Sequence, residues 1–415
     1  MSRPDPTPRL PPRCDVLVVG AGPAGSAAAQ KLAAQGLDVL LVDQHEFPRD
    51  KICGDGLIPD THAAFRRLGV YDEVAALAMP VQHVRCVGPR GGHIDIPGQL
   101  SVLPRKQLDH ILVRAAQRAG AVLATPVKFE APLEENGRVV GARLKHAGQN
   151  GTTCEVRARW TVLATGAVPA ALMAAGLCDR HTPSGVALRG YVRHDAMVGR
   201  ITQLQIVWHP RMRGGYGWIF PAPGGLFNIG AGLTGSHIQT RSARGNKGSR
   251  DSANLKDFFQ AFCEIYAPAR ELMAGGQLQG ELKGAPLRCS LIGGRWSRPG
   301  LLVAGEAAGS TYAFSGEGIG KAMETGMIAA EAIHNATDDD AVQAHHAQGL
   351  RRIKPQFDLY ETASRVNHHP WLADLVIWRG RKSPRILNRL SGVLEETQNP
   401  GRLFTVSGIT KLMFE

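Results

Sequence analysis

The fold of this chain is decided by residues 14–43, which read CDVLVVGAGPAGSAAAQKLAAQGLDVLLVD. The apolar run at 14–19 is typical of a buried strand, and the run at 38–43 has the same character. Between them, the alanine-rich stretch 23–36 begins with proline and ends with glycine, as helices commonly do. A strand, a helix and a second strand in this order form a βαβ unit, which predicts a parallel sheet.

The turn between the first strand and the helix matches the motif GxGxxG. Asp43 ends the second strand, and this context favours a dinucleotide site over an ordinary glycine-rich turn with a solvated aspartate. Gly20 permits the tight turn, Gly22 lets a pyrophosphate approach the backbone, and Gly25 allows close helix packing. Free N–H groups at the helix start favour phosphate, and the Asp43 carboxylate can accept hydrogen bonds from ribose hydroxyls. The cofactor-binding residues predicted here are Gly20, Gly22, Pro23, Ala24, Gly25, Asp43 and Gln44.

Length and charge limit the classes of protein and partner. The chain has 415 residues, more than one hydrophobic core usually holds, so at least two packed units are expected. Its formal net charge of +12 favours anionic partners such as a phosphorylated cofactor. The basic residues are scattered and no nucleic-acid-binding motif is present, so we expect no nucleic-acid partner. The seven widely spaced cysteines match neither a disulfide framework nor a zinc site, and they suit a reducing cytoplasm.

Three further features concern the ends and connections of the chain. Residues 1–13 are rich in proline and arginine and lack the apolar run of a signal peptide, so we expect a disordered leader. Residues 241–253 are polar, with glycine and serine, and predict a mobile loop. No stretch approaches the roughly 18 uncharged apolar residues that a membrane-spanning helix needs. Further helices are expected at 108–120 and 318–335, and strands within 121–145 and at 158–165 and 300–304.

Four later stretches resemble a known family. They are FPRDKICGDG at 47–56, Arg105 followed by LD at 108–109, YGWIFP at 216–221 with GAG at 230–232, and GEAAG at 305–309 with GEGI at 316–319. In these stretches the chain resembles the geranylgeranyl reductase family of flavoproteins, within the group built like para-hydroxybenzoate hydroxylase. The resemblance runs from Asp15 to the C-terminus, and it implies that FAD is the cofactor.

The resemblance also implies a fold. We expect an α/β protein with a Rossmann-type FAD-binding domain, an inserted antiparallel-sheet substrate domain and a helical C-terminal region. The expected division is a discontinuous FAD-binding domain at 14–75, 100–180 and 290–335, a substrate-binding sheet domain at 76–99 and 181–289, and a helical region at 336–415.

Further cofactor residues follow from the same resemblance. Glu306, after Gly305, stands where the family usually has aspartate and would accept hydrogen bonds from the ribityl hydroxyls. Gly316 and Gly318 open a helix at Ile319 whose free N–H groups would face the flavin pyrimidine edge and favour reduction. Arg105 would bind near the phosphates or the ribityl chain, since a guanidinium suits phosphate oxygens, although a surface arginine is the alternative. Val127 would contact adenine through its backbone.

The candidate catalytic residues come from two stretches. Cys53 lies in the segment that reaches the catalytic face of the flavin in the family, where it would donate a proton or act as a redox-sensitive thiol. Asp55 would shuttle protons, and for both residues simple loop packing is the alternative. Tyr216, Trp218 and Phe220 alternate along a predicted strand, so they share one face and would line an apolar cavity; an aromatic core stripe is the alternative. Cys53 or Tyr216 is the candidate acid.

Flavoproteins of this architecture reduce carbon–carbon double bonds, hydroxylate or halogenate. Halogenases carry WxWxIP and hydroxylases typically GDAAH, whereas this chain has YGWIFP at 216–221 and GEAAG at 305–309. We therefore expect hydride transfer from N5 of FADH₂ to an isoprenoid or other hydrophobic substrate. A monooxygenase or halogenase acting on a natural-product intermediate is the alternative, and a flavin-bearing redox sensor is the non-enzyme alternative.

The sequence indicates less about the electron donor, the substrate and membrane contact than about the cofactor. Apart from residues 20–25, no GxGxxG motif stands between a predicted strand and a predicted helix, so NADPH is expected only as a transient electron donor, with ferredoxin as the other candidate. A hydrophobic small molecule or lipid is the expected substrate. The basic segment 377–382 has two interpretations, a solvated helix face or peripheral contact with anionic lipid headgroups.

Overall fold

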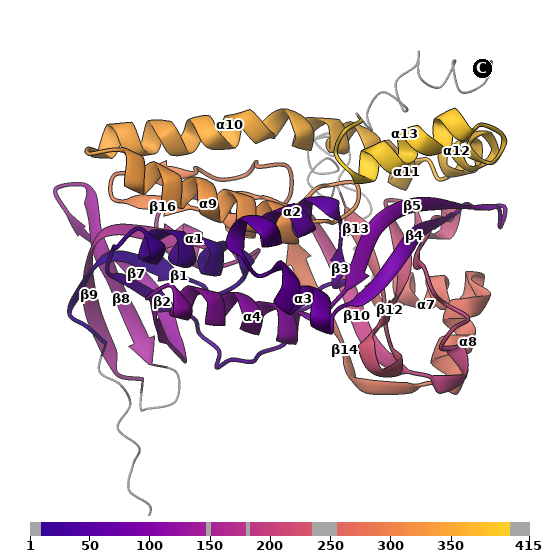
Figure 1. The fold of residues 1–415 in the computed structure, drawn as a ribbon, viewed down its shortest axis with the longest axis horizontal. Helices are drawn as coiled ribbons and strands as arrows, with labels where there is room; N and C mark the ends of the chain where they lie inside the picture. Colours follow the sequence, from indigo (N-terminus) through magenta and orange to yellow (C-terminus); the bar gives the residue numbers. More distant parts are fainter. Residues whose placement is uncertain (1–9, 147–150, 180–182, 235–254, 399–415) are drawn as a thin grey trace, which may run out of the picture.

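The computed structural model describes residues 10–146, 151–179, 183–234 and 255–398. It contains two eight-stranded sheets that lie side by side, with helices covering the first sheet and a group of C-terminal helices covering one end of the second (Figure 1). The α/β fold with a curled antiparallel sheet and a helical C-terminal region agrees with the expected class.

The first sheet is built around the predicted βαβ unit. Its strands are β1 (Arg13–Val19), β2 (Val39–Val42), β6 (Val122–Ala124), β7 (Val127–Glu135), β8 (Arg138–His146), β9 (Thr153–Leu163), β15 (Ser297–Arg298) and β16 (Leu301–Val303). The strand order is β15-β16-β9-β1-β2-β6, and β7 and β8 form a hairpin attached to β9. β1 pairs in parallel with β2 and with β9, which confirms the parallel sheet. The hairpin turns at Asn136-Gly137, and both residues have positive φ.

Helices cover this sheet on both sides. They are α1 (Pro23–Ala34), α4 (Arg105–Arg118), α5 (Ala170–Ala174), α9 (Ile319–Asn335) and α10 (Asp339–Ala363), and α2 (Pro59–Leu68) and α3 (Tyr71–Leu77) lie beside them. α1 packs against α4 and α9, and α10 runs along α9 (Figure 1). The alanine-rich sequence of α1 explains this closeness, because its small side chains at positions 24, 27, 28, 29 and 33 are all buried.

Two boundaries differ from expectation. α4 begins at Arg105 and not at 108, because Pro104 precedes it and Arg105 pairs with Asp109 one turn later. Residues 10–13, at the end of the expected leader, are among the described residues. Arg13 is already part of β1, and the Pro12 carbonyl accepts a hydrogen bond from the Arg157 N–H at 3.0 Å. Residues 1–9 of the leader and the expected loop at 241–253 lie outside the described residues.

The second sheet carries the aromatic motif. Its strand order is β14-β10-β13-β12-β11-β4-β5-β3. The strands are β3 (Gly56–Leu57), β4 (Met79–Val87), β5 (His93–Val102), β10 (Gly185–Arg193), β11 (Leu204–Val207), β12 (Gly215–Ala222), β13 (Leu226–Thr234) and β14 (Gln277–Leu287), and α7 (Leu255–Ile265) and α8 (Ala267–Gly275) pack on them. All pairings are antiparallel except β4 with β11. β3 and the end of β5 join this sheet because they pair with each other, although both fall in ranges expected for the cofactor domain.

The C-terminal helices complete the fold. α11 (Arg365–His368), α12 (Trp371–Lys382) and α13 (Pro384–Leu394) follow α10, and α12 and α13 pack against β4 and β5. The expected helical character is therefore present up to residue 394, and 399–415 lie outside the described residues. Among the helices that the structure describes, none is long and apolar enough to span a membrane.

Candidate active site

A cavity of about 990 Å³ runs between the two sheets. One end is lined by the glycine turn after β1 and by the start of α1. The middle is lined by the loop at 50–56 and by residues 315–319 before α9. The far end is lined by β4, β5, β11 and β12 and is roofed by α12 and α13. A single space therefore joins the predicted dinucleotide motif to the aromatic motif.

The glycine motif has the geometry its sequence predicts. Gly20 has a φ of +99°, and a Cβ there would lie 2.4 Å from the Ala164 carbonyl oxygen, so only glycine fits. A Cβ on Gly25 would lie 1.8 Å from the Gly20 carbonyl oxygen, which explains the close packing of the helix on the turn. Gly22 borders the cavity and has open space: the nearest atom to a Cβ there is Nη2 of Arg49, at 3.7 Å. α1 begins at Pro23 without a side-chain cap, so its free N–H groups face this space.

Asp43 closes this end of the site. Its carboxylate accepts hydrogen bonds from the Ala21 N–H at 2.9 Å and from the His45 N–H at 3.0 Å. Oδ2 also accepts from Arg49 Nη2 at 3.4 Å, whereas Oδ1 keeps a second lone pair for a ribose hydroxyl. Asp43 and Gln44 both line the cavity. Val127 lines it too, but its N–H donates to the Asp43 carbonyl oxygen at 2.7 Å, so a backbone contact to a base would use its carbonyl group.

Two arginines face the glycine turn. A Cβ on Gly22 would lie 3.7 Å from Nη2 of Arg49 and 4.0 Å from Nη2 of Arg105. Both guanidinium groups are held by buried Asp109, with distances of 2.6 Å from Arg105 Nε and 3.0 Å from Arg49 Nη1. Nε of Arg49 is buried and has no hydrogen-bond partner among the described residues. Two guanidinium groups, a helix start and an unpaired buried donor fit a pyrophosphate.

Arg105 therefore faces the glycine turn, and its contact with the cofactor stays a prediction, whereas Arg49 was not predicted. A signal for Arg49 exists in the sequence, because it is the only arginine in the loop that follows the acidic end of β2. Position alone, however, does not show which way that side chain points.

Residues 305–319 form the second predicted cofactor element. Gly305 has a φ of +67°, and a Cβ there would lie 2.6 Å from the Cβ of Ala24, so this turn packs directly on α1. Glu306 lines the cavity, and its Oε1 accepts a hydrogen bond from Thr311 Oγ1 at 3.4 Å. Gly316 and Gly318 have no room for a side chain, because Tyr216 Oη and Thr311 Oγ1 would lie 2.9 Å and 2.6 Å from a Cβ. Ser315, Glu317 and Ile319 also line the cavity here.

Carboxylates surround the start of α9, which the sequence did not suggest. Burial, and then the charge of Asp60, raises the pKa of Glu317 to about 8. Burial also raises the pKa of Asp60 to about 7, against the opposing charge of Lys321. Lys321 Nζ lies 2.8 Å from Glu396 Oε2, so a buried cation lies among these carboxylates. Positions 60, 317 and 396 are too far apart in sequence for any local pattern to reveal their proximity.

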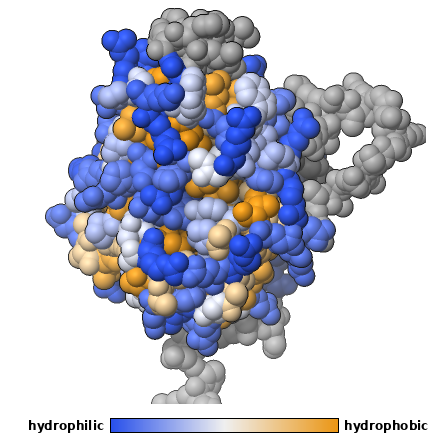
Figure 2. Space-filling model, turned by 90° about the vertical axis from the view of Figure 1, so that its right-hand side faces the viewer, coloured by the Kyte–Doolittle hydropathy of each residue, from blue (hydrophilic) through white to orange (hydrophobic). Residues whose placement is uncertain are grey.

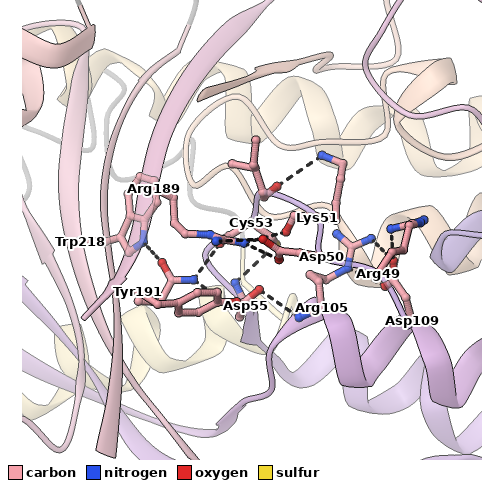
Figure 3. Close-up of polar contacts among 12 residues, drawn as sticks. Arg49, Asp50, Lys51, Cys53, Asp55, Arg105, Asp109, Arg189, Tyr191 and Trp218 are labelled. Atoms are coloured by element: carbon pink, nitrogen blue, oxygen red, sulfur yellow. Dashed lines mark hydrogen bonds and ion pairs between the residues drawn. The ribbon is translucent and has the colours of Figure 1, made fainter. Parts of the chain in front are cut away.

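The loop that carries Cys53 lies between β10 of the second sheet and the start of α4 (Figure 3). Arg189 of β10 is 2% exposed and donates from Nε to the Cys53 carbonyl oxygen at 3.1 Å. It also donates to the Lys51 carbonyl and pairs with Asp50, both at 2.9 Å. Burial opposes the charge of Arg189, but Asp50 and Tyr191 raise its pKa. The half-buried Cys53 side chain lines the cavity.

Asp55 is fully buried at the centre of a polar network. Its carboxylate accepts hydrogen bonds from the Tyr191 hydroxyl, from Asn228 Nδ2 at 2.8 Å and from the Arg105 N–H at 3.3 Å. Its φ of 64° is unusual for a residue other than glycine. Burial raises its pKa to about 6, against the hydrogen bond from Tyr191. Tyr191 and Asn228 were not predicted, and they come from strands far from Asp55 in the sequence.

The aromatic side chains of β12 form one wall of the cavity. Tyr216, Trp218 and Phe220 all line it, with ring centroids 6.2 Å and 6.4 Å apart along the row. The Tyr216 hydroxyl donates to the Ser315 carbonyl oxygen, and burial raises its pKa. Gly54 lets the loop approach this wall, because a Cβ there would lie 3.2 Å from Phe220 Cε2.

The far end of the cavity is apolar. Trp208 and Phe314 stack there, with centroids 6.2 Å apart and an interplanar angle of 7°. The other apolar side chains at this end are Val84, Ile94, Ile96, Leu204, Ile206, Val366, Ala373, Val376, Ile377, Leu390, Val393 and Leu394. This arm is suited to a long hydrophobic ligand, with polar groups confined to the end near Cys53.

These features define an FAD-dependent oxidoreductase with the flavoprotein monooxygenase-like fold. Residues 13–198 match the family model described as an FAD binding domain. Among solved structures, a geranylgeranyl bacteriochlorophyll reductase-like protein from Thermoplasma acidophilum has a TM-score of 0.72 at 24% identity, covering 97% of this chain and 96% of that one. A flavin-dependent brominase has the same fold, with a TM-score of 0.72 at 18% identity and 97% of each chain covered.

Curated relatives give the family. Menaquinone reductase of Mycolicibacterium smegmatis is 32% identical over 366 residues, covering 81% of this chain and 82% of the relative. Digeranylgeranylglycerophospholipid reductase 1 of Methanopyrus kandleri is 29% identical over 358 residues, covering 85% of this chain and 89% of the relative. The chain belongs to the geranylgeranyl reductase family of FAD-dependent oxidoreductases, as its motifs indicated.

Proposed function

We propose that this protein reduces carbon–carbon double bonds in the isoprenoid chain of a lipid or quinone. The observation that carries the proposal is the single cavity that runs from the Cys53 loop into an apolar arm under α12 and α13. The names of the relatives, menaquinone reductase and digeranylgeranylglycerophospholipid reductase, support a hydrophobic substrate of this class.

The proposed cofactor site uses residues from both ends of the chain. The pyrophosphate of FAD would be held by Gly22, Pro23 and Ala24, with Arg49 and Arg105 beside them. The adenosine would lie near Asp43, Gln44 and Val127. The remaining proposed contacts, to the ribityl chain and the ring, come from Gly305, Glu306, Gly316, Gly318 and Ile319. When bound and reduced, FAD supplies the hydride for the reaction.

Cys53 is the better candidate for the acid that protonates the other carbon. Its side chain lines the cavity where the polar loop meets the apolar arm. The Tyr216 hydroxyl already donates a hydrogen bond to the Ser315 carbonyl oxygen, and its raised pKa makes it a weaker acid. Asp55 borders the cavity, but its carboxylate is fully buried and is held by Tyr191, Asn228 and the Arg105 N–H, so it would hold a proton near Cys53 and would not itself protonate the substrate.

The cavity walls suit the chemistry of an isolated alkene. Such an alkene would accept hydride when protonation of the other carbon leads, so that positive charge develops on the accepting carbon, and this charge must be stabilised and water excluded. The ring faces of Tyr216, Trp218 and Phe220 attract positive charge, and the apolar arm keeps water out. These three residues would therefore orient the substrate and stabilise its charge without exchanging protons with it.

Oxygen chemistry is the second candidate, because a flavin-dependent brominase shares the fold. An anaerobic assay distinguishes the two functions. The FAD-loaded protein is photoreduced without oxygen and mixed with a menaquinone or a geranylgeranyl-bearing phospholipid, and the product is analysed by mass spectrometry. We expect flavin reoxidation and a product two mass units heavier per double bond reduced. Reoxidation that requires oxygen and adds oxygen or halogen to the substrate would refute the reductase and support the alternative.

We further propose that α12 contacts an anionic membrane surface while the substrate enters. Ile377 lines the cavity, whereas its neighbour Trp378 is 46% exposed and Trp371 is 56% exposed. Arg379 and Lys382 lie over the Trp378 ring, at 5.3 Å and 4.8 Å. Tryptophan with basic residues is typical of membrane interfaces. Figure 2 shows small hydrophobic groups between hydrophilic ones on this side, which suits surface contact more than insertion.

Vesicle pelleting tests this contact. Wild type should sediment with vesicles containing phosphatidylserine at low salt, and a W371S/W378S double variant should remain in the supernatant. Equal sedimentation of both proteins would contradict the role of α12.

The electron donor is proposed to be transient, either NADPH or ferredoxin. Anaerobic reduction of the flavin with each donor in turn distinguishes the two.

A further inference from the structure

Asn228 joins the Cys53 loop to the aromatic wall of the cavity. It lies on β13 and is fully buried. Its Nδ2 donates to the Cys53 carbonyl oxygen at 2.8 Å and to Asp55 Oδ2 at 2.8 Å, and its Oδ1 accepts from Trp218 Nε1 at 2.9 Å. One side chain thus contacts both the proposed acid's backbone and the substrate-facing wall.

The chemistry of the partners fixes the orientation of the Asn228 amide. The indole N–H of Trp218 is only a donor, so it must face the amide oxygen. The Cys53 carbonyl is only an acceptor, so it must face the amide nitrogen. Both N–H groups of the amide are used, and no other side chain of the same size offers two donors and one acceptor in this arrangement. A packing role alone would not need this polarity in a fully buried position.

We propose that Asn228 is a positioning residue that holds Cys53 at the junction of the polar loop and the apolar arm. The inference rests on the proposed function, in which Cys53 is the acid. Arg189 donates to the same Cys53 carbonyl from β10, so the loop is held from two strands of the second sheet. Asn228 adds a link that Arg189 lacks, because it also binds Trp218. The position of Cys53 is thereby tied to the wall against which the substrate lies.

The chain contains a matched control for Asn228. Asn367 is also fully buried, and its Oδ1 accepts from the indole Nε1 of Trp208 at 2.8 Å. Its Nδ2 donates to Thr234 Oγ1 at 2.9 Å and to the Phe314 carbonyl at 3.2 Å. Asn367 therefore makes the same kind of contact with a cavity tryptophan, but none of these side-chain hydrogen-bond partners lies in the loop at 50–56. Loss of Asn367 removes a comparable amount of buried hydrogen bonding without releasing Cys53.

The experiment measures how fast iodoacetamide alkylates Cys53 in the FAD-loaded protein, read by mass spectrometry of the peptide that contains it. Cys154, on β9, serves as the internal reference. We expect N228A to raise the rate of Cys53 alkylation about tenfold, because the loop loses the two hydrogen bonds from the Asn228 amide that hold it in place. N367A should leave the rate close to wild type. N228D keeps the shape and the acceptor for Trp218 but loses both donors, so it should also raise the rate, and it serves if N228A does not fold.

The outcomes separate this inference from the proposed function. Alkylation needs no substrate, so a wild-type rate in both Asn228 variants, or an equal rise in N367A, would overturn the positioning role even if the protein reduces alkenes. Conversely, a faster rate in the Asn228 variants would sustain it even if no alkene is reduced. Where turnover is measured, N228A should lower kcat and leave KM near wild type, since the apolar arm is intact. A change confined to KM would also count against the inference.

Discussion

Replacing Arg49 by methionine should weaken FAD binding and leave riboflavin binding unchanged. The Arg49 guanidinium faces Gly22, at 3.7 Å from the position of a Cβ, and its Nε has no partner among the described residues. The side chain is only 12% exposed, so solvent screens its charge little. A hydrogen bond to a charged group contributes about 1.5–3 kcal/mol, which corresponds to a ten- to hundredfold rise in the Kd for FAD. Methionine reaches about as far as Nε and removes the guanidinium group with its charge and donors.

Fluorescence quenching on titration of the apoprotein measures both affinities. Riboflavin has no phosphate, so its affinity should not depend on Arg49. Asp109 keeps its paired hydrogen bonds with Arg105 in the variant, so the fold should be retained. R67M is the control, because Arg67 is 50% exposed and pairs with Glu331 on the surface. The reasoning is refuted if R49M binds FAD as wild type does, or if it loses riboflavin to the same extent.

Three further outcomes follow from the site and the core. C53A should lower turnover roughly a hundred- to ten-thousandfold while the bound-flavin absorbance is kept, and C154A should match wild type in the same assay. V376F should raise KM for a long-chain substrate by roughly tenfold, because Val376 lines the apolar arm, whereas L375F, next to it but outside the cavity lining, should not. Burial lowers the pKa of His346 to about 4, below its unfolded value of 6.5, so the unfolded chain binds more protons between these values and stability falls as the pH drops through this window. Urea unfolding should show wild type losing about 2 kcal/mol more than H346L between pH 7 and pH 5, and equal losses would contradict the buried neutral imidazole.

Local sequence was sufficient for the cofactor half of the fold. The turn from Gly20 to Gly25 is governed by backbone sterics and by contacts between neighbouring elements, so its pattern and its structure coincide. The same holds for the hairpin at Asn136-Gly137 and for the alternating aromatic residues of β12. In each of these, the residues that specify the structure lie within a few positions of one another.

The polar network around the Cys53 loop could not be predicted in this way. Tyr191 and Asn228 meet Asp55 from strands more than 130 positions later in the chain, and no spacing rule links them. The cluster of Asp60, Glu317 and Glu396 around Lys321 has the same origin. Asp55 itself reads as a loop residue, because the sequence shows neither its burial nor its positive φ. Such groups depend on the packing of the two sheets, and only the assembled fold reveals them.

A crystal structure of the protein with FAD bound tests the central claim most directly. The account predicts pyrophosphate density within hydrogen-bonding distance of the backbone at residues 22–24 and of Arg49, with the ring between the Cys53 loop and the start of α9. It also predicts that the apolar arm under α12 stays open beside the ring. Ring density inside that arm, or a cofactor that does not touch the glycine turn, would contradict the assignment of the cavity to FAD and a hydrophobic substrate.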